Sequence, residues 1–454
     1  MDIFKNKKIA VVGFGVEGLS SALYLVGKGA EVTIFDQNKE ITEKDAFEEA
    51  KKMKASFVLG DFYLERIKGF DLVVRSPGVQ LALLEKYVPK DKITSQIKLF
   101  FDLCPAEIIG ITGTKGKGTT ASLLYEMLKK QGFDAYLGGN IGLPPFDFLD
   151  KLNTQSKVIL ELSSFQLLDL KKSPHIAVML MITSEHLDYH SSIEEYIDVK
   201  RNIVRHQTPK DFAILNRDYP ATNESDIHTS GKIFHVSRER EAADEGSFVR
   251  DEKVWLRVGD QEIEIIDVKD ILLPGKHNLE NVCAATMAAY LAGVSGENIA
   301  AVLATFKGLE HRLELVATIN GVRYYDDSFS TTPETAIAAI QSFKEPEILI
   351  LGGSSKNSDF KELGEVIAKA ENIGTIIGIG VEWERIKAQI SSSESPIPVI
   401  EGAKDMKTIV AAAYKLAVPG DVVLLTPACA SFGMFKNYKD RGEQFKKEVT
   451  SLQS

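Results

Sequence analysis

The sequence has few cysteines, no long apolar run and no excess of basic residues. Its three cysteines, Cys104, Cys283 and Cys429, are odd in number and far apart, which favours neither a disulfide framework nor a cysteine-based metal site. No apolar run reaches the roughly 18 residues that predict a membrane span, and the first residues contain no secretory signal. The net charge of -10 argues against a general nucleic-acid-binding protein. These absences predict a reduced, cytoplasmic protein.

The composition and the pattern of apolar residues predict an α/β fold. The 454 residues suggest about three domains at roughly 150 residues each, and 44% hydrophobic with 26% charged residues exclude disorder as the main state. Short β-branched runs alternate with helical stretches, which is typical of parallel sheets. The expected strands are residues 9–12, 31–35, 72–75, 108–112, 158–162, 176–182, 348–351, 375–379 and 422–425.

Separate α/β units are expected to start near Gly13, near Gly113 and after residues 308–312, which suggests boundaries near Cys104-Pro105 and near Gly308. Residues 216–251 interrupt the alternation because they are polar and rich in turn residues. Two short strands, residues 254–258 and 262–266, are then expected to flank a hairpin turn. We interpret this segment as a small β excursion inside the middle part of the chain.

A first glycine-rich turn, with Gly13, Gly15 and Gly18, follows the first expected strand, and Asp36 ends the next one. This is the dinucleotide fingerprint, in which glycines let the backbone approach a pyrophosphate and the acid accepts from a ribose hydroxyl. Two other interpretations stay open: a turn that needs glycine only for packing, and a site for another diphosphate nucleotide. A hydroxyl and backbone donors at the same sheet edge would come from Ser76, Pro77 and Gly78.

A second glycine-rich turn, residues 113–120, lies between an expected strand and a helix predicted over residues 121–130. Its N–H groups and the helix start would form an anion cradle, Lys117 would neutralise the β- and γ-phosphates, and a threonine would bind Mg²⁺. A glycine turn with capping threonines is the alternative, but it leaves the Gly-Lys-x-Thr-Thr order unexplained. Gly118 occupies the place directly after the lysine, so the metal-binding role moves to Thr119 or Thr120.

Three residues farther along the chain could complete this site. Glu161 ends an expected strand, where a carboxylate can hold a metal ion, although it could also be an ion-paired or capping residue. His186 alone would be a structural histidine, but beside a phosphate loop it is a candidate metal ligand. Lys200 lies in a charged helix predicted over residues 192–205 and by itself indicates a solvated face.

Together these motifs resemble the Mur ligases, ATP-dependent enzymes that form amide bonds in peptidoglycan precursor synthesis. The resemblance covers nearly the whole chain and is greatest to the branch that adds glutamate. Further matching motifs are Gly139-Asn140-Ile141-Gly142, Glu161-Leu162-Ser163-Ser164-Phe165-Gln166-Leu167, Glu185-His186-Leu187-Asp188, Pro274-Gly275-Lys276-His277-Asn278, His311-Arg312, Asp327-Ser328, Thr426-Pro427-Ala428-Cys429-Ala430-Ser431 and Arg441-Gly442.

The resemblance implies three domains and one reaction. Residues 1–103 would form a Rossmann-like domain for a UDP substrate, residues 104–309 a central P-loop ATPase-type domain with a mixed sheet, and residues 310–454 a Rossmann-like domain that binds the incoming amino acid and closes over the site. The implied reaction adds D-glutamate to UDP-N-acetylmuramoyl-L-alanine through an acyl phosphate. ATP, two Mg²⁺ ions and small-molecule substrates would be needed, with no nucleic acid or membrane partner, and the protein would be a monomer.

The resemblance also assigns roles to single residues. The catalytic group would be Lys117, Glu161, His186 and Lys200, the last of these carbamylated. ATP would bind Gly113, Thr114, Lys115, Gly116, Lys117, Gly118, Thr119, Thr120, Asn278, Arg312 and Asp327. The UDP substrate would bind Gly15, Val16, Asp36, Ser76, Pro77, Gly78 and Asn140. The metal ligands would be Thr119, Thr120, Glu161, His186 and Lys200, and the incoming amino acid would meet Thr331, Lys356, Ser431, Phe432 and Tyr438.

Two positions depart from the family pattern and leave alternatives open. Lys115 stands where the family often has asparagine, and Phe329 where it often has lysine. The loss of a cation at Phe329 leaves the identity and stereochemistry of the amino acid open, L-glutamate being one alternative. An NAD(P)-dependent oxidoreductase using Gly13, Gly15 and Gly18 and a non-catalytic nucleotide switch are the other two hypotheses.

Overall fold

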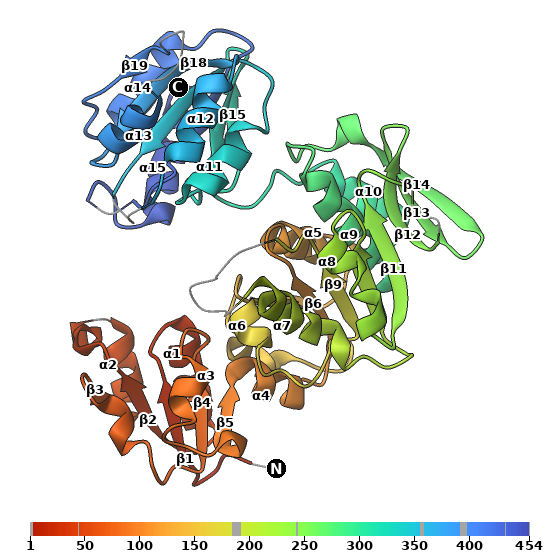
Figure 1. Cartoon of the computed structure of the whole chain (residues 1–454), viewed down its shortest axis with the longest axis vertical. Helices are drawn as coiled ribbons and strands as arrows, with labels where there is room; N and C mark the ends of the chain where they lie inside the picture. The colour runs from red at the N-terminus through yellow and green to blue at the C-terminus, as the bar shows by residue number, and fades with distance from the viewer. Residues whose placement is uncertain are drawn as a thin grey trace. The chain divides into compact units, whose positions relative to one another are not determined.

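The computed structural model describes residues 3–43, 45–183, 192–241, 244–354, 358–390, 397–431 and 433–453. In this part of the chain the strands form three sheets, with helices between most of the strands (Figure 1). The chain divides into two compact units, one made of residues 1–268 and 279–303 and the other of residues 269–278 and 304–454. The predicted α/β fold class is confirmed.

The first sheet has five parallel strands in the order β3-β2-β1-β4-β5. Successive residues of a strand point to opposite faces, so Ile9 and Val11 join one buried cluster while Ala10 and Val12 join another. The elements are β1 (Lys8–Val12), α1 (Val16–Gly27), β2 (Glu31–Asp36), α2 (Asp45–Lys52), β3 (Ser56–Leu59), β4 (Leu72–Arg75), α3 (Leu81–Leu84), β5 (Ile93–Ser95) and α4 (Gln96–Leu103).

The second sheet has nine strands in the order β14-β13-β12-β11-β10-β9-β6-β8-β7. The seven strands β6 to β12 are parallel. Its strands are β6 (Glu107–Thr112), β7 (Ala135–Gly139), β8 (Lys157–Glu161), β9 (Ile176–Met179), β10 (Phe212–Asn216), β11 (Lys232–Ser237), β12 (Gly246–Arg250), β13 (Lys253–Val258) and β14 (Gln261–Asp267). Its helices are α5 (Lys117–Gln131), α6 (Ser164–Leu167), α7 (Ile193–Arg205), α8 (Pro220–Asn223), α9 (Asn278–Leu291) and α10 (Gly296–Leu303).

The interpretation of residues 216–251 as a polar, turn-rich interruption is wrong. Both β11 and β12 lie in this segment, and they join the hairpin β13–β14 to the rest of the second sheet. Their polar residues hide the strand pattern: in β11, Phe234 and Val236 are buried, whereas Lys232 is exposed and His235 half-buried. The predicted hairpin itself is confirmed, and it lies at one edge of the central sheet.

The third sheet lies in the second unit and has the strand order β15-β16-β20-β17-β18-β19. Along β17, Leu349 and Leu351 pack with α11, α12 and α13, and Ile348 and Ile350 pack with α14 and α15, so helices cover both faces. The elements are β15 (Glu314–Ile319), β16 (Val322–Asp326), α11 (Pro333–Ile340), β17 (Glu347–Gly352), α12 (Lys361–Lys369), β18 (Ile373–Ile379), α13 (Trp383–Ile390), β19 (Val399–Ile400), α14 (Met406–Leu416), β20 (Val422–Leu425) and α15 (Tyr438–Ser451).

Inside the first unit, a buried arginine links the first sheet to the elements after β8. Arg75, at the end of β4, is 1% exposed, and its Nη2 atom donates to the carbonyl oxygen of Phe165 and to Asp169 Oδ1, both at 3.1 Å. Lys98 Nζ lies 3.0 Å from Asp169 Oδ2. A buried guanidinium needs such partners because an unpaired buried charge is costly.

Most of the residues with predicted roles follow the carboxyl ends of parallel strands. Gly13 and Ser76 follow β1 and β4 of the first sheet, and Gly113 follows β6 of the second, where Glu161 ends β8. In the third sheet Asp327 follows β16. In open α/β sheets this is the edge at which ligands bind.

Candidate active site

The loop between β6 and α5 has the backbone geometry of an anion cradle. Gly113 and Gly116 have φ angles of 158° and 85°, and the second value is costly for any residue with a Cβ atom. α5 begins at Lys117, before the start predicted at Ala121. The sequence GKGTT therefore enters the first turn of α5, where N–H groups without helical partners can bind phosphate oxygens.

Asn281 of α9 supports this loop and is not among the residues predicted from the sequence. A Cβ atom at Gly116 would lie 2.1 Å from Asn281 Oδ1, and Thr120 Oγ1 donates to the same oxygen at 3.3 Å. Asn281 is buried. The available signal was its spacing of three residues from Asn278 in an otherwise alanine-rich helix, which places both amides on one helix face.

Two lysines from distant parts of the sequence converge on the loop. Lys117 Nζ donates to the carbonyl oxygens of Gly113 and Thr114 at 3.1 and 3.0 Å. Lys200 Nζ donates to the same Gly113 carbonyl at 2.9 Å and lies 4.7 Å from the ring centroid of Tyr196. Lys200 is only 1% exposed, so the interpretation of its position as a solvated helix face is wrong.

A carboxylate and an amide lie beside these lysines. Glu161, the last residue of β8, is 2% exposed, and its Oε1 atom lies 4.0 Å from Lys117 Nζ. Asn140 donates its backbone N–H to the carbonyl oxygen of Glu161 at 2.9 Å and its side-chain Nδ2 to Glu161 Oε1 at 3.5 Å. The structure thus brings together four residues that the sequence analysis named from four separate motifs.

The first glycine-rich turn is closed by short contacts within the first sheet. Ser76 Oγ donates to the carbonyl oxygen of Gly13 at 3.0 Å, and a Cβ atom at Gly18 would lie 2.0 Å from that oxygen. Asp36 Oδ2 accepts the backbone N–H of Phe14 at 2.7 Å. Glycine is therefore required at position 18 for packing, and Asp36 is fixed at the turn, with Gly15 and Val16 exposed beside it.

Glu17 lies inside this turn and was also missed. Gln166 Nε2 donates to Glu17 Oε1, and Glu17 Oε2 has no hydrogen-bond partner among the described residues. Burial raises the pKa of Glu17 to about 7, although the hydrogen bond from Gln166 and the charge of Arg75 act in the opposite direction. Glu17 occupies a variable place of the glycine fingerprint, so the motif itself gave no signal for it.

In the second unit, the segment after β16 carries a buried carboxyl group. Asp327 is 2% exposed, accepts the N–H of Leu313 at 3.1 Å and accepts the hydroxyl of Thr426 at 2.9 Å. Burial raises the pKa of Asp327 to about 7, against the hydrogen bonds from Ser330 and Thr426. At neutral pH this group can therefore either donate or accept a hydrogen bond.

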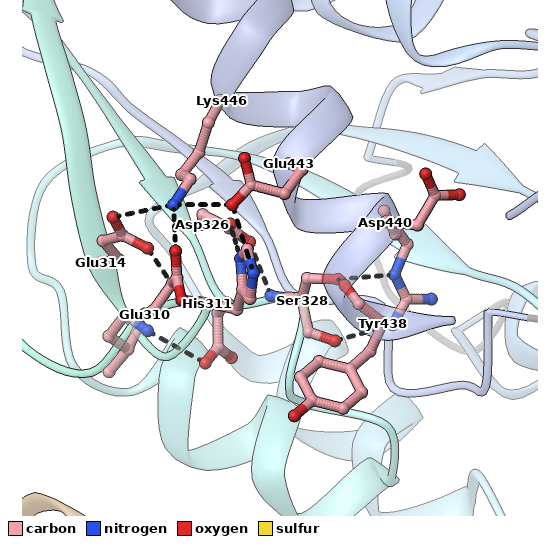
Figure 2. Close-up of polar contacts among 12 residues, drawn as sticks. Glu310, His311, Glu314, Asp326, Ser328, Tyr438, Asp440, Glu443 and Lys446 are labelled. Carbon is pink, nitrogen blue, oxygen red and sulfur yellow. Dashed lines mark hydrogen bonds and ion pairs between the residues drawn. The ribbon is translucent and has the colours of Figure 1, made fainter. Parts of the chain in front are cut away.

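Aromatic residues lie next to the predicted phosphate and amino-acid contacts of the second unit. The guanidinium of Arg312 is 5.4 Å from the ring centroid of Phe329, and the Tyr438 ring meets Phe329 edge-on at 5.2 Å. Phe329 is 43% exposed. Ser431 is buried and Thr331 half-buried. Figure 2 shows Tyr438 near Ser328, at the edge of a group of charged residues.

Three predicted residues, His186, Lys356 and Phe432, lie outside the described residues. Among the residues that are described, no helix combines the length and apolar character that crossing a bilayer needs.

Models of three protein families match the chain. Residues 7–88 match the N-terminal domain of MurD-like Mur ligases, residues 111–289 the Mur ligase middle domain, and residues 311–429 the glutamate ligase domain of Mur ligases. A protein of Acetivibrio thermocellus named UDP-N-acetylmuramoylalanine–D-glutamate ligase is 41% identical, over 99% of this chain and 97% of that protein. A protein of the same name from Caldanaerobacter subterraneus subsp. tengcongensis is 39% identical, over 99% of both chains.

Solved structures show the same fold at low identity. The MurF ligase of Thermotoga maritima in complex with ADP has a TM-score of 0.59 and 18% identity, over 93% of this chain and 96% of that one. The UDP-N-acetylmuramate-alanine ligase MurC of the same organism has a TM-score of 0.59 and 16% identity, over 98% of this chain and 100% of that one. Likenesses at this level concern the fold alone.

Proposed function

The chain belongs to the Mur ligase family, and we propose that it uses ATP to join D-glutamate to UDP-N-acetylmuramoyl-L-alanine in peptidoglycan precursor synthesis. The observation that carries the proposal is the end-to-end relationship, at 41% identity, to a protein named for this reaction. The convergence of Lys117, Lys200, Glu161 and Asn140 supports it, because an acid-activating ligase must hold a triphosphate next to a carboxylate.

The proposed reaction has two steps. A carboxylate is a poor acylating agent, so its oxygen first attacks the γ-phosphorus of ATP, the bond to the bridging oxygen breaks, and ADP leaves. The product is an acyl phosphate. The neutral amine of D-glutamate then attacks the acyl carbon to give a tetrahedral intermediate. The amine nitrogen loses a proton, and the intermediate expels inorganic phosphate. Exclusion of water protects the acyl phosphate from hydrolysis.

The loop and three residues of other motifs would bind ATP. N–H groups of residues 113–120 would hold the phosphates, with Lys117 spreading the charge of the transferring phosphoryl group. Lys117 now donates to two loop carbonyls, so its ammonium already lies at the cradle. Asn278 would contact the adenine, Arg312 the phosphates and Asp327 the ribose.

The donor atoms near the loop suit two Mg²⁺ ions, which prefer oxygen ligands and offset phosphate charge. Glu161 would supply one ligand and His186 another. Thr120 already donates to Asn281, which favours Thr119 as the hydroxyl ligand. Lys200 would join the set as a carbamate, because carbamylation turns its cation into an anion that can face a metal ion.

The remaining predicted residues would hold the other two substrates. The UDP substrate would lie on Gly15, Val16, Asp36 and the segment from Ser76 to Gly78, with Asn140 at its reactive end. The carboxylates of D-glutamate would meet Thr331, Lys356, Ser431, Phe432 and Tyr438. We also propose that the protein acts as a monomer in the cytoplasm, where such nucleotide precursors are made.

Phosphate release with UDP-N-acetylmuramoyl-L-alanine tests the proposal when D-glutamate, L-glutamate and other amino acids are compared. We expect release with D-glutamate only. Lys117→Ala should lower the rate at least about a hundredfold, since it removes the cation from the phosphate cradle, whereas Lys130→Ala, at the exposed end of α5, should not. Lys200→Ala should be nearly inactive and partly rescued by short carboxylic acids. Release that needs no amino acid, or full activity of Lys117→Ala, would refute the assignment.

A further inference from the structure

A buried ion pair lies directly behind two of the residues proposed to bind ATP. His311 is 2% exposed and Asp326 is fully buried. The Nδ1 atom of His311 lies 2.7 Å from Asp326 Oδ2 (Figure 2). Arg312 follows the histidine and Asp327 follows the aspartate in sequence. The pair therefore fixes the two backbone positions from which the proposed phosphate and ribose contacts extend.

The turn that carries Arg312 has a disfavoured backbone. His311 and Leu313 have φ angles of 62° and 47°. This left-handed region is rare for residues other than glycine, although histidine, asparagine and aspartate enter it more often than most, and leucine does so seldom. Such a conformation persists where the surroundings hold it in place. Here the N–H of Phe329 donates to the carbonyl oxygen of His311 at 2.9 Å, and the N–H of Leu313 donates to Asp327 Oδ1 at 3.1 Å.

α15 packs against the pair and leaves no room for rearrangement. A Cβ atom at Gly442 would lie 2.1 Å from His311 Nδ1 and 2.6 Å from Asp326 Oδ2. The preceding residue of α15 is Arg441, whose Nε donates to Ser328 Oγ at 2.9 Å and whose Nη2 donates to the carbonyl oxygen of Ser328 at 2.8 Å. The helix α15 thus contacts both the pair and the segment that follows β16.

Charged residues around the pair favour the protonated histidine. Glu443 Oε1 lies 3.7 Å from His311 Nε2, and Glu314 accepts the backbone N–H of His311 at 2.8 Å. Burial lowers the pKa of His311. The hydrogen bond and the charge of Asp326 outweigh this effect, so the pKa lies above its ordinary value. Lys446 of α15 and Glu310 complete the group of charges that face the ring.

The same group could be mistaken for a metal site. Ligand atoms of Glu310, His311 and Glu443 lie within 4.8 Å of one another. However, Lys446 Nζ lies 3.0 Å from Glu310, 3.4 Å from Glu314 and 3.1 Å from Glu443. The ammonium group already occupies the position among these carboxylates that a cation would take.

We infer that His311 is a positioning residue: its ion pair with Asp326 holds the left-handed turn of residues 311–313 and thereby places Arg312 and Asp327 for ATP. The inference rests on the proposed function, because it assigns the ATP contacts to these two neighbours. It predicts that the KM for ATP changes most, because both residues that the turn places directly are proposed ATP contacts.

Steady-state phosphate release by the full-length protein separates two contributions of His311: its pair with Asp326 and its tolerance of a left-handed φ. His311→Ala removes both the pair and the residue's tolerance of a left-handed φ, and should raise the KM for ATP at least about tenfold. His311→Asn keeps that tolerance but cannot form the pair, so it should show an intermediate rise. The KM for the UDP substrate should change less than about twofold. Lys447→Ala, an exposed neighbour on α15, is the matched control.

The pH dependence of nucleotide binding provides a second readout. Protonated His311 holds the turn, so the Kd of a non-hydrolysable ATP analogue should rise as the pH increases through the raised pKa of the histidine. Asp326→Asn should bind the analogue more weakly than the wild type at pH 6.5, with a flatter pH profile. This binding measurement also covers variants that fold but do not turn over, and circular dichroism identifies any that do not fold.

The outcomes distinguish the inference from the function on which it rests. A wild type that releases no phosphate with any amino acid would refute the proposed function. A working wild type in which His311→Ala and Asp326→Asn change the KM for ATP no more than Lys447→Ala would refute the inference alone. Equal losses for all three substrates would also refute it, because a general loss of folding would then explain the variants.

Discussion

Lys200 and Glu161 are buried charged residues, and both lie beside the loop that carries Lys117. Removing a charge from water costs several kcal/mol unless partners compensate. Here the Gly113 carbonyl accepts from Lys200, and Asn140 donates to Glu161. Burying charge at this one sheet edge is the pattern that strengthens electrostatic contacts with a bound phosphate.

Glu17 gives a prediction at the same scale. Its pKa, raised to about 7 by burial, means that the carboxyl group is largely protonated below pH 7 and becomes an anion above it. An anion in the first glycine-rich turn would repel the diphosphate of the UDP substrate. We expect the Kd of the wild type for UDP-N-acetylmuramoyl-L-alanine to rise by up to about tenfold per pH unit above pH 7.

Isothermal titration at pH 6 and pH 8.5 checks this expectation. Glu17→Gln, which stays neutral at both values, should bind with similar affinity at each. Glu31→Gln changes an exposed residue at the start of β2, the end of the strand away from the turn. This variant should keep the pH dependence of the wild type. If Glu17→Gln weakens with pH as much as the wild type does, the carboxyl group of Glu17 is not responsible.

At the scale of elements, the two ends of α5 have the same backbone problem and different surroundings. Gly116 precedes the helix with a φ angle of 85°, and Gly132 follows it with a φ angle of 93°. A Cβ atom at Gly116 would lie 2.1 Å from Asn281 Oδ1, whereas one at Gly132 would have nothing within 4 Å. The helix start therefore needs glycine both for its positive φ and for the space that Asn281 takes, whereas the helix end needs it for its positive φ alone.

Alanine substitutions at these two glycines separate the two reasons. Both Gly116→Ala and Gly132→Ala should lower stability by about 1 kcal/mol, because alanine is strained at positive φ. Only Gly116→Ala should also displace Asn281 and the first turn of α5, and raise the Kd for an ATP analogue by at least about tenfold. Melting temperature and nucleotide titration measure the two effects. Equal nucleotide affinities in both variants would contradict the assigned role of the helix start.

At the scale of the whole molecule, the third sheet, in the second compact unit, contains an unusual buried carboxyl group. Glu347 begins β17 and is 1% exposed. Its Oε1 atom accepts from Asn372 at 2.8 Å, and its Oε2 atom has no hydrogen-bond partner within the described ranges. Burial raises the pKa of Glu347 to about 8, against the hydrogen bond from Asn372.

The raised pKa predicts how the stability of the second unit depends on pH. The folded protein keeps a proton on Glu347 that the unfolded chain releases above its ordinary pKa of 4.5. The unfolded state therefore binds fewer protons, and stability should fall between about pH 5 and pH 8. Glu347→Gln should match the wild type near pH 5 and melt at a higher temperature at pH 8.5. Glu371→Gln, an exposed control, should follow the wild type, and a Glu347→Gln curve that does so too would disprove the prediction.

The sequence by itself determined the local features of this protein. Most expected strands are present to within a few residues, because β-branched runs and glycine turns express preferences of neighbouring residues. The position of Glu161 at a strand end and of Gly113 at a turn followed from the same local rules. Polar strands such as β11 were missed because pairing within the sheet, and not their hydropathy, determines them.

Only the tertiary structure decided which distant residues meet. Lys200 lies 87 positions from Gly113 in sequence. Its burial could not be predicted, because the charged residues of its helix indicate a face exposed to solvent. The partners of Glu17, the contact between Gly116 and Asn281, and the pair of His311 with Asp326 are likewise long-range or side-chain contacts. They depend on how helices pack on the sheets, which no local pattern specifies.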